Sequence, residues 1–198
     1  MRSRIAVLAS GGGSNLQAIL DYFSSKGEQR SADVVAVISD RTGAFALERA
    51  RSSDIEAVVL PYADHGALEE TLVSRDVDLV VLAGYLRLLP PSVIHRFRHR
   101  IVNIHPGPLP RFGGPGMYGE RVHAAVIAAG IRESAVTVHA VEEEYDSGAI
   151  LAQWPVSIMD GDTPESLSRR VLEVEHILYP RVIELVLALL ASNTITTS

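Results

Sequence analysis

The stretch "IAVLASGGGSNLQAIL" (residues 5–20) decides the fold prediction, because it joins an apolar run to a helical pattern through three consecutive glycines. Residues 5–8 are continuously apolar, which is typical of a parallel strand covered on both faces. The glycines permit a tight turn, and we expect Ser14 and Asn15 to cap a helix over residues 14–25. A strand that leads into a helix in this way is the first half of a βαβ unit.

The same alternation of strand and helix repeats through the first half of the chain. Further apolar runs lie at residues 34–39, 57–60, 78–84 and 101–104, and helical patterns lie between them at residues 44–52, 66–75 and 91–97. Repeated strand–helix–strand units require right-handed crossovers. The sequence therefore predicts an α/β fold with a doubly wound, mostly parallel sheet.

The C-terminal part of the chain shows a different strand pattern. A helix over residues 120–129 is expected to end at Gly130, which suits the position just after a helix. Residues 134–141 alternate apolar and polar side chains, and residues 149–156 form a second strand after a loop. We expect these two strands to pair antiparallel at one side of the sheet.

The last helix is expected to begin with Thr163 as its N-cap and Pro164 as its first residue. Pro180 lacks a backbone donor, so we expect it to kink or break this helix, leaving a second piece that ends near residue 190. The sequence contains no linker or repeat, which predicts a single domain over residues 1–191. Residues 192–198 are polar and are expected to form a flexible tail.

Composition limits the classes of partner. The chain has 198 residues, of which 47% are apolar and 21% are charged, and its net charge of −6 argues against an extended nucleic-acid-binding surface. It contains no cysteine, which excludes disulfides, thiolate metal sites and thiol nucleophiles. We also expect no interaction with a membrane, because the apolar runs are short. These features predict a soluble, cytoplasmic protein whose partners are small molecules.

The glycine-rich turn is a candidate phosphate site. Gly12, Gly13, Ser14 and Asn15 lie where free N–H groups and the positive end of a helix favour an anion. The turn lacks the Lys-Ser/Thr of a Walker loop, and Leu16 occupies the third glycine position of a dinucleotide-binding motif. A plain tight turn remains the alternative interpretation.

Asn103 and His105 form the candidate catalytic pair. Residues two apart in a strand point the same way, so both side chains lie on one face at the carboxyl end of residues 101–104, where open α/β sheets bind ligands. An amide donor beside an imidazole suits acyl transfer, with stabilisation of an oxyanion and movement of a proton. Asp146, in an acidic turn, is the expected third member. The alternatives are a capping Asn, a buried His with its partners satisfied, and a solvated surface carboxylate.

Taken together, "SGGGSNLQAI", "DLVVLAGYLRLL", "NIHPGPLP", "TVHAVEEEYDSGAIL" and "VEHILYP" resemble the phosphoribosylglycinamide formyltransferase family of purine biosynthesis. The resemblance spans nearly the whole chain. It implies a Rossmann-like formyltransferase fold and transfer of a formyl group from 10-formyltetrahydrofolate, as co-substrate, to the amine of 5′-phosphoribosylglycinamide. No metal and no covalent enzyme intermediate are implied.

The resemblance also implies roles for individual residues. The implied catalytic residues are Asn103, His105 and Asp146, of which the first two would stabilise the oxyanion and the third would help to move the proton. The implied substrate-binding residues are Gly12, Gly13, Ser14, Asn15, Arg170 and Glu175. The implied residues for the folate are Leu86, Arg87, Leu88, Leu89, Asn103, Val141 and Asp146.

Several alternatives stay open. A 10-formyltetrahydrofolate hydrolase would carry the same three catalytic residues, and another folate-dependent formyltransferase would share the Asn-x-His pair. A non-catalytic nucleotide-binding module would need only the glycine turn. The chain has Gly107 and Pro108 where the family usually has Ser and Leu, which leaves closure of the loop over residues 107–119 undecided. The Arg that commonly contacts the folate tail has no clear counterpart. Both a monomer and a homodimer are compatible with the sequence.

Overall fold

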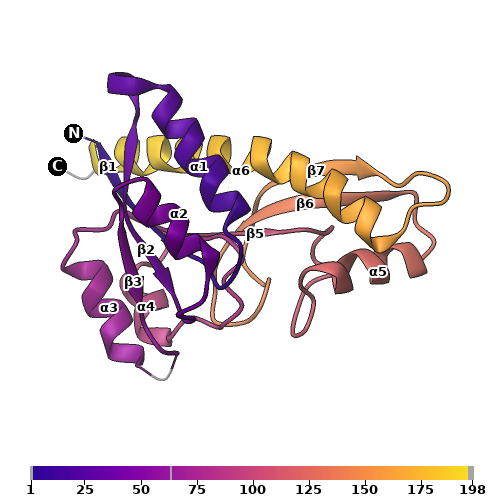
Figure 1. Ribbon diagram of the computed structural model, residues 1–198, viewed down its shortest axis with the longest axis horizontal. Helices are drawn as coiled ribbons and strands as arrows, with labels where there is room; N and C mark the ends of the chain where they lie inside the picture. The colour runs from indigo at the N-terminus through magenta and orange to yellow at the C-terminus, as the bar shows by residue number, and fades with distance from the viewer. Residues whose placement is uncertain (1, 63, 196–198) are drawn as a thin grey trace.

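The computed structural model describes residues 2–62 and 64–195, and a seven-stranded sheet forms its centre (Figure 1). The strands are β1 (Ser3–Leu8), β2 (Ala32–Ser39), β3 (Glu56–Val59), β4 (Leu79–Leu82), β5 (Ile101–His105), β6 (Glu133–Ala140) and β7 (Ile150–Ser157). Their order across the sheet is β3-β2-β1-β4-β5-β6-β7. Strands β1 to β5 are parallel, whereas β6 pairs antiparallel with both β5 and β7. The predicted doubly wound, mostly parallel sheet with antiparallel pairing near the C-terminus is confirmed.

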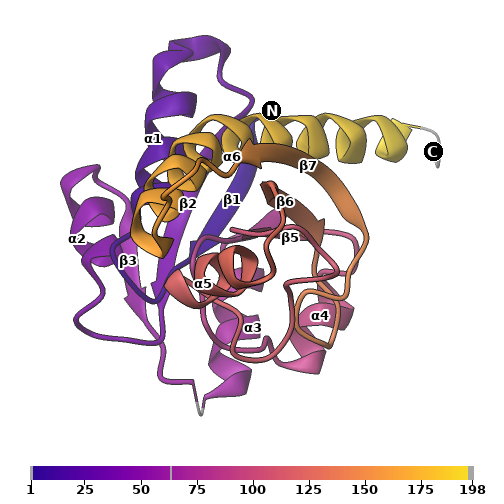
Figure 2. The same cartoon turned by 90° about the vertical axis from the view of Figure 1, so that its right-hand side faces the viewer.

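Helices cover both faces of the sheet (Figure 2). They are α1 (Ser14–Ser25), α2 (Phe45–Ser52), α3 (His65–Val73), α4 (Pro91–Arg96), α5 (Glu120–Ala128) and α6 (Pro164–Ile195), with a short 3-10 helix at Gly27–Gln29. Alternate residues of β1 enter different cores: Ile5 and Val7 pack with α1 and α6, and Ala6 and Leu8 pack with α3 and α4. Burial on both faces explains why the first strands are continuously apolar.

The turn between β1 and α1 differs from its prediction. Gly13, at φ +70°, is the N-cap of α1, and no side chain caps this helix, so the expected capping by Ser14 and Asn15 is wrong. A Cβ on Gly13 would lie 2.8 Å from the Cα of Ala46 in α2. Close packing against α2 therefore requires glycine here, and it leaves the side chain of Asn15 free to point inward.

The long helix α6 confirms one prediction and corrects two others. Thr163 and Ser166 exchange side-chain to backbone hydrogen bonds at the start of the helix, as expected for a cap. Pro180, however, does not break the helix, which is continuous from Pro164 to Ile195 (Figure 1). The expected tail is also helical up to residue 195, and residues 196–198 lie outside the described part of the chain.

Packing around Pro180 explains the unbroken helix. The neighbouring Tyr179 is fully buried, and its hydroxyl donates to the carbonyl of Leu82 at 2.7 Å and also lies 3.1 Å from that of Val102. Ile183 is fully buried in the same core. Burying side chains of this size contributes roughly 1.5–3 kcal/mol each, which offsets the roughly 3 kcal/mol cost of a proline within a helix.

Candidate active site

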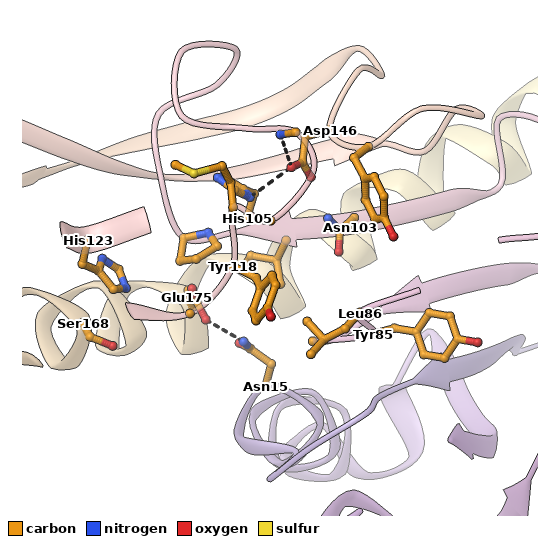
Figure 3. A pocket seen from close by; sticks show the side chains of 18 of the residues that line it. Asn15, Tyr85, Leu86, Asn103, His105, Tyr118, His123, Asp146, Ser168 and Glu175 are labelled. Carbon is orange, nitrogen blue, oxygen red and sulfur yellow. Dashed lines mark hydrogen bonds and ion pairs between the residues drawn. The ribbon is translucent and has the colours of Figure 1, made fainter. Parts of the chain in front are cut away.

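A cavity of about 410 Å³ lies where the parallel and antiparallel halves of the sheet meet (Figure 3). It is lined by Asn15, Gly84, Tyr85, Leu86, Asn103, Ile104, His105, Pro106, Gly114, Pro115, Gly116, Met117, Tyr118, Gly119, His123, Tyr145, Asp146, Ser168, Leu172 and Glu175. Six of these residues were predicted from the sequence: Asn15, Leu86, Asn103, His105, Asp146 and Glu175. They come from segments that are far apart in the sequence, and the fold brings the three catalytic candidates and two of the substrate-binding candidates into one cavity.

The register between β5 and β6 places a second imidazole beside the predicted pair. Asn103 lies opposite His139, and His105 lies opposite Thr137. His139 donates from Nδ1 to the carbonyl of Ala140 at 2.7 Å, so its Nε2 accepts from the Asn103 amide nitrogen at 3.0 Å. The second N–H of the Asn103 amide therefore remains able to donate to a ligand in the cavity.

The turn after β6 holds Asp146 against both imidazoles. Asp146 has a φ of +54°, a left-handed conformation that is strained for a residue with a Cβ. One carboxylate oxygen, Oδ2, accepts the N–H of Gly114 at 2.9 Å and lies 3.6 Å from His105 Nδ1 (Figure 3). The other oxygen, Oδ1, lies 3.4 Å from His139 Nε2. The turn needs Gly148, because a Cβ there would lie 1.8 Å from the carbonyl oxygen of Ala140.

Electrostatics keep this carboxylate ionised and its neighbour neutral. Burial alone would raise the pKa of Asp146, but its contacts with His139 and His105 and the hydrogen bond from the Gly114 N–H together lower it below its usual value. Burial lowers the pKa of His105, although the charge of Asp146 opposes this effect. His105 Nε2 donates to the Phe112 carbonyl at 2.8 Å, so the free lone pair of the neutral ring is on Nδ1 and faces Asp146. This arrangement can accept a proton.

The opposite end of the cavity holds a second carboxylate. Glu175 is only 6% exposed and accepts a hydrogen bond of 2.6 Å from the Asn15 amide nitrogen. Burial raises the pKa of Glu175 to about 7, and the Asn15 hydrogen bond opposes this shift only in part. Within the described part of the chain, the buried atoms Asn15 Oδ1 and His123 Nδ1 have no hydrogen-bond partner. Unpaired buried polar atoms are costly, so this end of the cavity is suited to a polar ligand.

Some predicted site residues do not line the cavity. Arg170 was expected to bind substrate, but its guanidinium is held by Asp162, with contacts of 2.7 and 3.0 Å, and it also donates to the Ser157 carbonyl. Asp162 in turn caps the start of α6 through the Ser166 hydroxyl. This pairing anchors the helix, so Arg170 is not brought to the site.

Fewer of the residues predicted for the folate line the cavity than expected. Of the segment "LRLL", only Leu86 lines the cavity, whereas Leu89 is 5% exposed and packs in the core beneath α3 and α4. Arg87 and Leu88 do not line it either. The N–H of Val141, which was expected to be available for the folate, donates to the Ile101 carbonyl at 3.1 Å.

The glycine turn lies beside the cavity rather than in its wall. Gly12, Gly13 and Ser14 are absent from the lining, and Gly12 instead faces an open hollow that it shares with Phe45. The Gly12 carbonyl accepts a hydrogen bond of 2.8 Å from Arg49 Nε. Asn15 is the residue of this motif that reaches the cavity.

Two histidines of the site, His139 and His123, were not predicted. The alternation of residues 134–141 places Thr137 and His139 on one face, which was a usable signal, but the pairing of this strand with residues 101–104 could not be read from the sequence. His123 lies on α5, where burial and then the charge of His105 lower its pKa to about 4. Its neighbours in the sequence are apolar, so it resembles an ordinary buried residue of a helix. In the described residues, no group of three or more His, Asp or Glu side chains is arranged to hold a metal ion.

Comparison with known proteins places this geometry in a family. The model of the formyl transferase family matches residues 3–183. The chain is 43% identical over 190 residues to a chloroplastic phosphoribosylglycinamide formyltransferase of Arabidopsis thaliana, and this match covers 92% of the chain and 64% of the relative. It is 39% identical over 188 residues to the phosphoribosylglycinamide formyltransferase of Haemophilus influenzae, covering 91% of the chain and 85% of that protein.

A solved structure shows the same architecture. The glycinamide ribonucleotide transformylase 1 of Symbiobacterium toebii superposes with a TM-score of 0.86 at 40% identity, covering 94% of the chain and 88% of that structure. The chain therefore spans less than two thirds of the length of the plant relative but most of the length of the bacterial proteins. Sequence and fold agree, and the chain belongs to the formyl transferase family.

Proposed function

We propose that this protein is a folate-dependent enzyme that transfers the formyl group of 10-formyltetrahydrofolate to the amine of 5′-phosphoribosylglycinamide. The products are the N-formyl compound and tetrahydrofolate, in de novo purine biosynthesis. One observation carries the proposal: the Asp146 carboxylate lies between His105 and His139, in the same cavity as Asn15 and Glu175. The names of the relatives in the plant and in the two bacteria support the choice of substrates.

The reaction makes one C–N bond and breaks another. The amine nitrogen attacks the formyl carbon, the carbonyl oxygen becomes an oxyanion, and the bond from carbon to folate N10 then breaks. The amine loses one proton and N10 gains one, so a group that first accepts and then returns a proton is required. Asp146 suits this role because it is ionised, and the free lone pair on Nδ1 of the neighbouring His105 can share the proton.

Asn103 is proposed to stabilise the oxyanion. Its amide donates one N–H to His139 and keeps the other for the developing negative charge. A donor that is already oriented needs no rearrangement during the reaction, and loss of such a donor typically costs about 10²–10³ in rate. A proton taken up at His105 Nδ1 would add a positive charge to the same wall of the cavity.

The two ends of the cavity are proposed to bind different substrates. Asn15 and Glu175 bind the ribose of phosphoribosylglycinamide, and Gly12, Gly13 and Ser14 bind its phosphate at the start of α1. Leu86, with Asn103 and Asp146, borders the formyl folate. The orphan oxygen of Asn15 supports this division, because a ligand hydroxyl would satisfy it.

Residues 1–191 are proposed to act as one domain with small molecules as its partners. Whether one or two chains assemble, and whether the protein acts in the cytoplasm, stay predictions. In the part of the chain that the structure describes, no helix is both long and apolar enough to cross a membrane.

The test is to follow the loss of the formyl group from 10-formyltetrahydrofolate by absorbance, with and without phosphoribosylglycinamide. Turnover only with the amine present would support the proposal. Turnover with water alone would show a hydrolase, and folded protein without turnover in either condition would favour a non-catalytic binding module. Either of these two results would contradict the proposal.

A further inference from the structure

The buried carboxylate of Asp40, just after β2, connects the ends of three neighbouring strands. Its side chain is only 2% exposed, and β1 lies between β2 and β4 in the sheet. One oxygen accepts a hydrogen bond of 2.6 Å from the hydroxyl of Ser10, which follows β1. The other accepts one of 3.2 Å from Arg87, which follows β4. The proposed mechanism makes no use of this carboxylate.

Ser10 links Asp40 to the wall of the cavity through hydrogen bonds. Its hydroxyl oxygen accepts the N–H of Leu86 at 3.2 Å, and its own N–H donates to the carbonyl of Gly84 at 3.0 Å. A hydroxyl has a single hydrogen, so donation to Asp40 turns its lone pairs towards the Leu86 amide. Gly84 and Leu86 both line the cavity. The Asp40 carboxylate therefore orients the Ser10 hydroxyl, which in turn holds the backbone of the cavity wall at Leu86.

Charge around Asp40 favours this arrangement. Arg87 stacks over the ring of Tyr62 at 5.1 Å while it pairs with Asp40, and Arg41 lies 3.8 Å from the same carboxylate oxygen. Burial, and then the negative charge of Asp40, raise the pKa of Tyr85 to about 12. Tyr85 lies in the same segment of the cavity wall, so the carboxylate acts on this segment by charge as well as through Ser10.

We propose that Asp40 is a positioning residue for the formyl-folate side of the cavity, acting through Ser10 and Arg87 on residues 84–87. This inference rests on the proposed function for the identity of the ligand. The glycine turn keeps independent backbone anchors, since Ala9 donates to Ile38 at 3.0 Å and Ala46 donates to Gly11 at 3.1 Å. Loss of Asp40 should therefore weaken binding of the folate more than binding of phosphoribosylglycinamide.

The first test measures the affinities of Asp40→Ala, Asp40→Asn and Ser10→Ala by calorimetry, with tetrahydrofolate and with phosphoribosylglycinamide. We expect Asp40→Ala to weaken tetrahydrofolate binding about tenfold, as loss of a charge-assisted hydrogen bond would. Phosphoribosylglycinamide affinity and kcat should change less than about twofold by the same scale. Asp40→Asn should have a smaller effect, because the amide oxygen can still accept from Ser10. This graded response would not result from general structural damage.

The matched control is Asp33→Asn, near the opposite end of the same strand. Asp33 is 38% exposed and pairs with Arg30, so it offers the same substitution without contact with the cavity. We expect wild-type behaviour from it in every assay.

A second readout does not depend on catalysis. Hydrogen exchange at the Leu86 amide should be faster in Asp40→Ala and Ser10→Ala than in the wild type, and unchanged in Asp33→Asn. Equal loss of affinity for both ligands, or unchanged exchange at Leu86 in Ser10→Ala, would overturn the inference. Wild-type protein that binds tetrahydrofolate but transfers no formyl group would overturn the proposed function instead. If Asp40→Ala fails to fold, the measurements on Ser10→Ala still decide the inference.

Discussion

The two ends of the cavity each hold a carboxylate that is largely shielded from solvent, yet the pKa values of these groups move in opposite directions. Asp146 has the Gly114 N–H and two imidazoles around it, and its pKa falls. Glu175 has a single amide donor, from Asn15, and its pKa rises to about 7. Burial disfavours the charged form in both cases, so the number of polar groups around each carboxylate decides which one remains ionised.

The opposite pKa shifts of Asp146 and Glu175 suit the two carboxylates to different chemical roles. Near neutral pH, Asp146 is an acceptor that can take the proton of an attacking amine. Burial raises the pKa of Glu175 to about 7, so its protonated form can donate an O–H to a ligand oxygen and its ionised form can accept from one. The comparison therefore supports the proposed separation between an end that performs chemistry and an end that binds.

The largest effect is expected from Asp146→Asn. The substitution keeps the shape of the side chain but removes the charge and the proton acceptor, so kcat should fall by about 10³-fold. Affinity for phosphoribosylglycinamide, measured by calorimetry, should change little because that ligand is proposed to bind at the other end. A variant with kcat within tenfold of the wild type would remove Asp146 from the mechanism.

A smaller loss is expected from His139→Ala. Without this imidazole, Asp146 loses one of its two ring partners and the Asn103 amide loses its acceptor, so kcat should fall by about 10²-fold. The matched control is His95→Ala on the surface, where His95 pairs with Glu143, and it should retain full activity. Equal rates for the two variants would show that His139 has no part in the chemistry.

Glu175→Gln should change how stability depends on pH. The folded pKa of Glu175 is raised to about 7 from 4.5, so its contribution to the free energy of unfolding is full below pH 4.5 and is lost as the pH rises towards 7. This loss amounts to at most about 3 kcal/mol. Urea unfolding at pH 5 and pH 8 should show the variant gaining stability relative to the wild type at the higher pH. Parallel pH profiles would contradict the account.

The smallest effect is expected from Asn15→Ala. It removes the one hydrogen bond that lowers the pKa of Glu175, so the decline in stability from pH 5 to pH 8 should steepen by less than about 1.5 kcal/mol. The same urea measurements apply to this variant. A shallower decline than in the wild type would show that Asn15 does not support the ionised form of Glu175.

The strands and the placement of Asn103 and His105 on one face were predictable because they depend on local periodicity. Asn103 and His105 share a face because of their spacing, and the parallel strands are recognisable in the sequence as apolar runs. The role of His139 depends on the register between β5 and β6, a contact between distant segments that no local pattern encodes. Pro180 was misjudged for a similar reason, since tertiary packing of Tyr179 and Ile183 overrides its local preference.

The binding end was predicted less well, because competing partners decide which polar side chains are available. The Arg170 guanidinium could bind an anionic substrate, but it already donates hydrogen bonds to both carboxylate oxygens of Asp162. Asn15 was expected to cap a helix, but Gly13 takes that position and releases Asn15 to bind Glu175. Such choices among partners appear only once the chain is folded.

The most direct test of the account is a titration of the side-chain carboxyl carbons of Asp146 and Glu175 by ¹³C NMR, with each signal assigned from the Asp146→Asn and Glu175→Gln variants. We predict that Glu175 titrates near pH 7 and that Asp146 titrates below its ordinary value of 3.8. If Asp146 instead titrates above Glu175, or both titrate at their ordinary values, the proposed division between a chemical end and a binding end is contradicted.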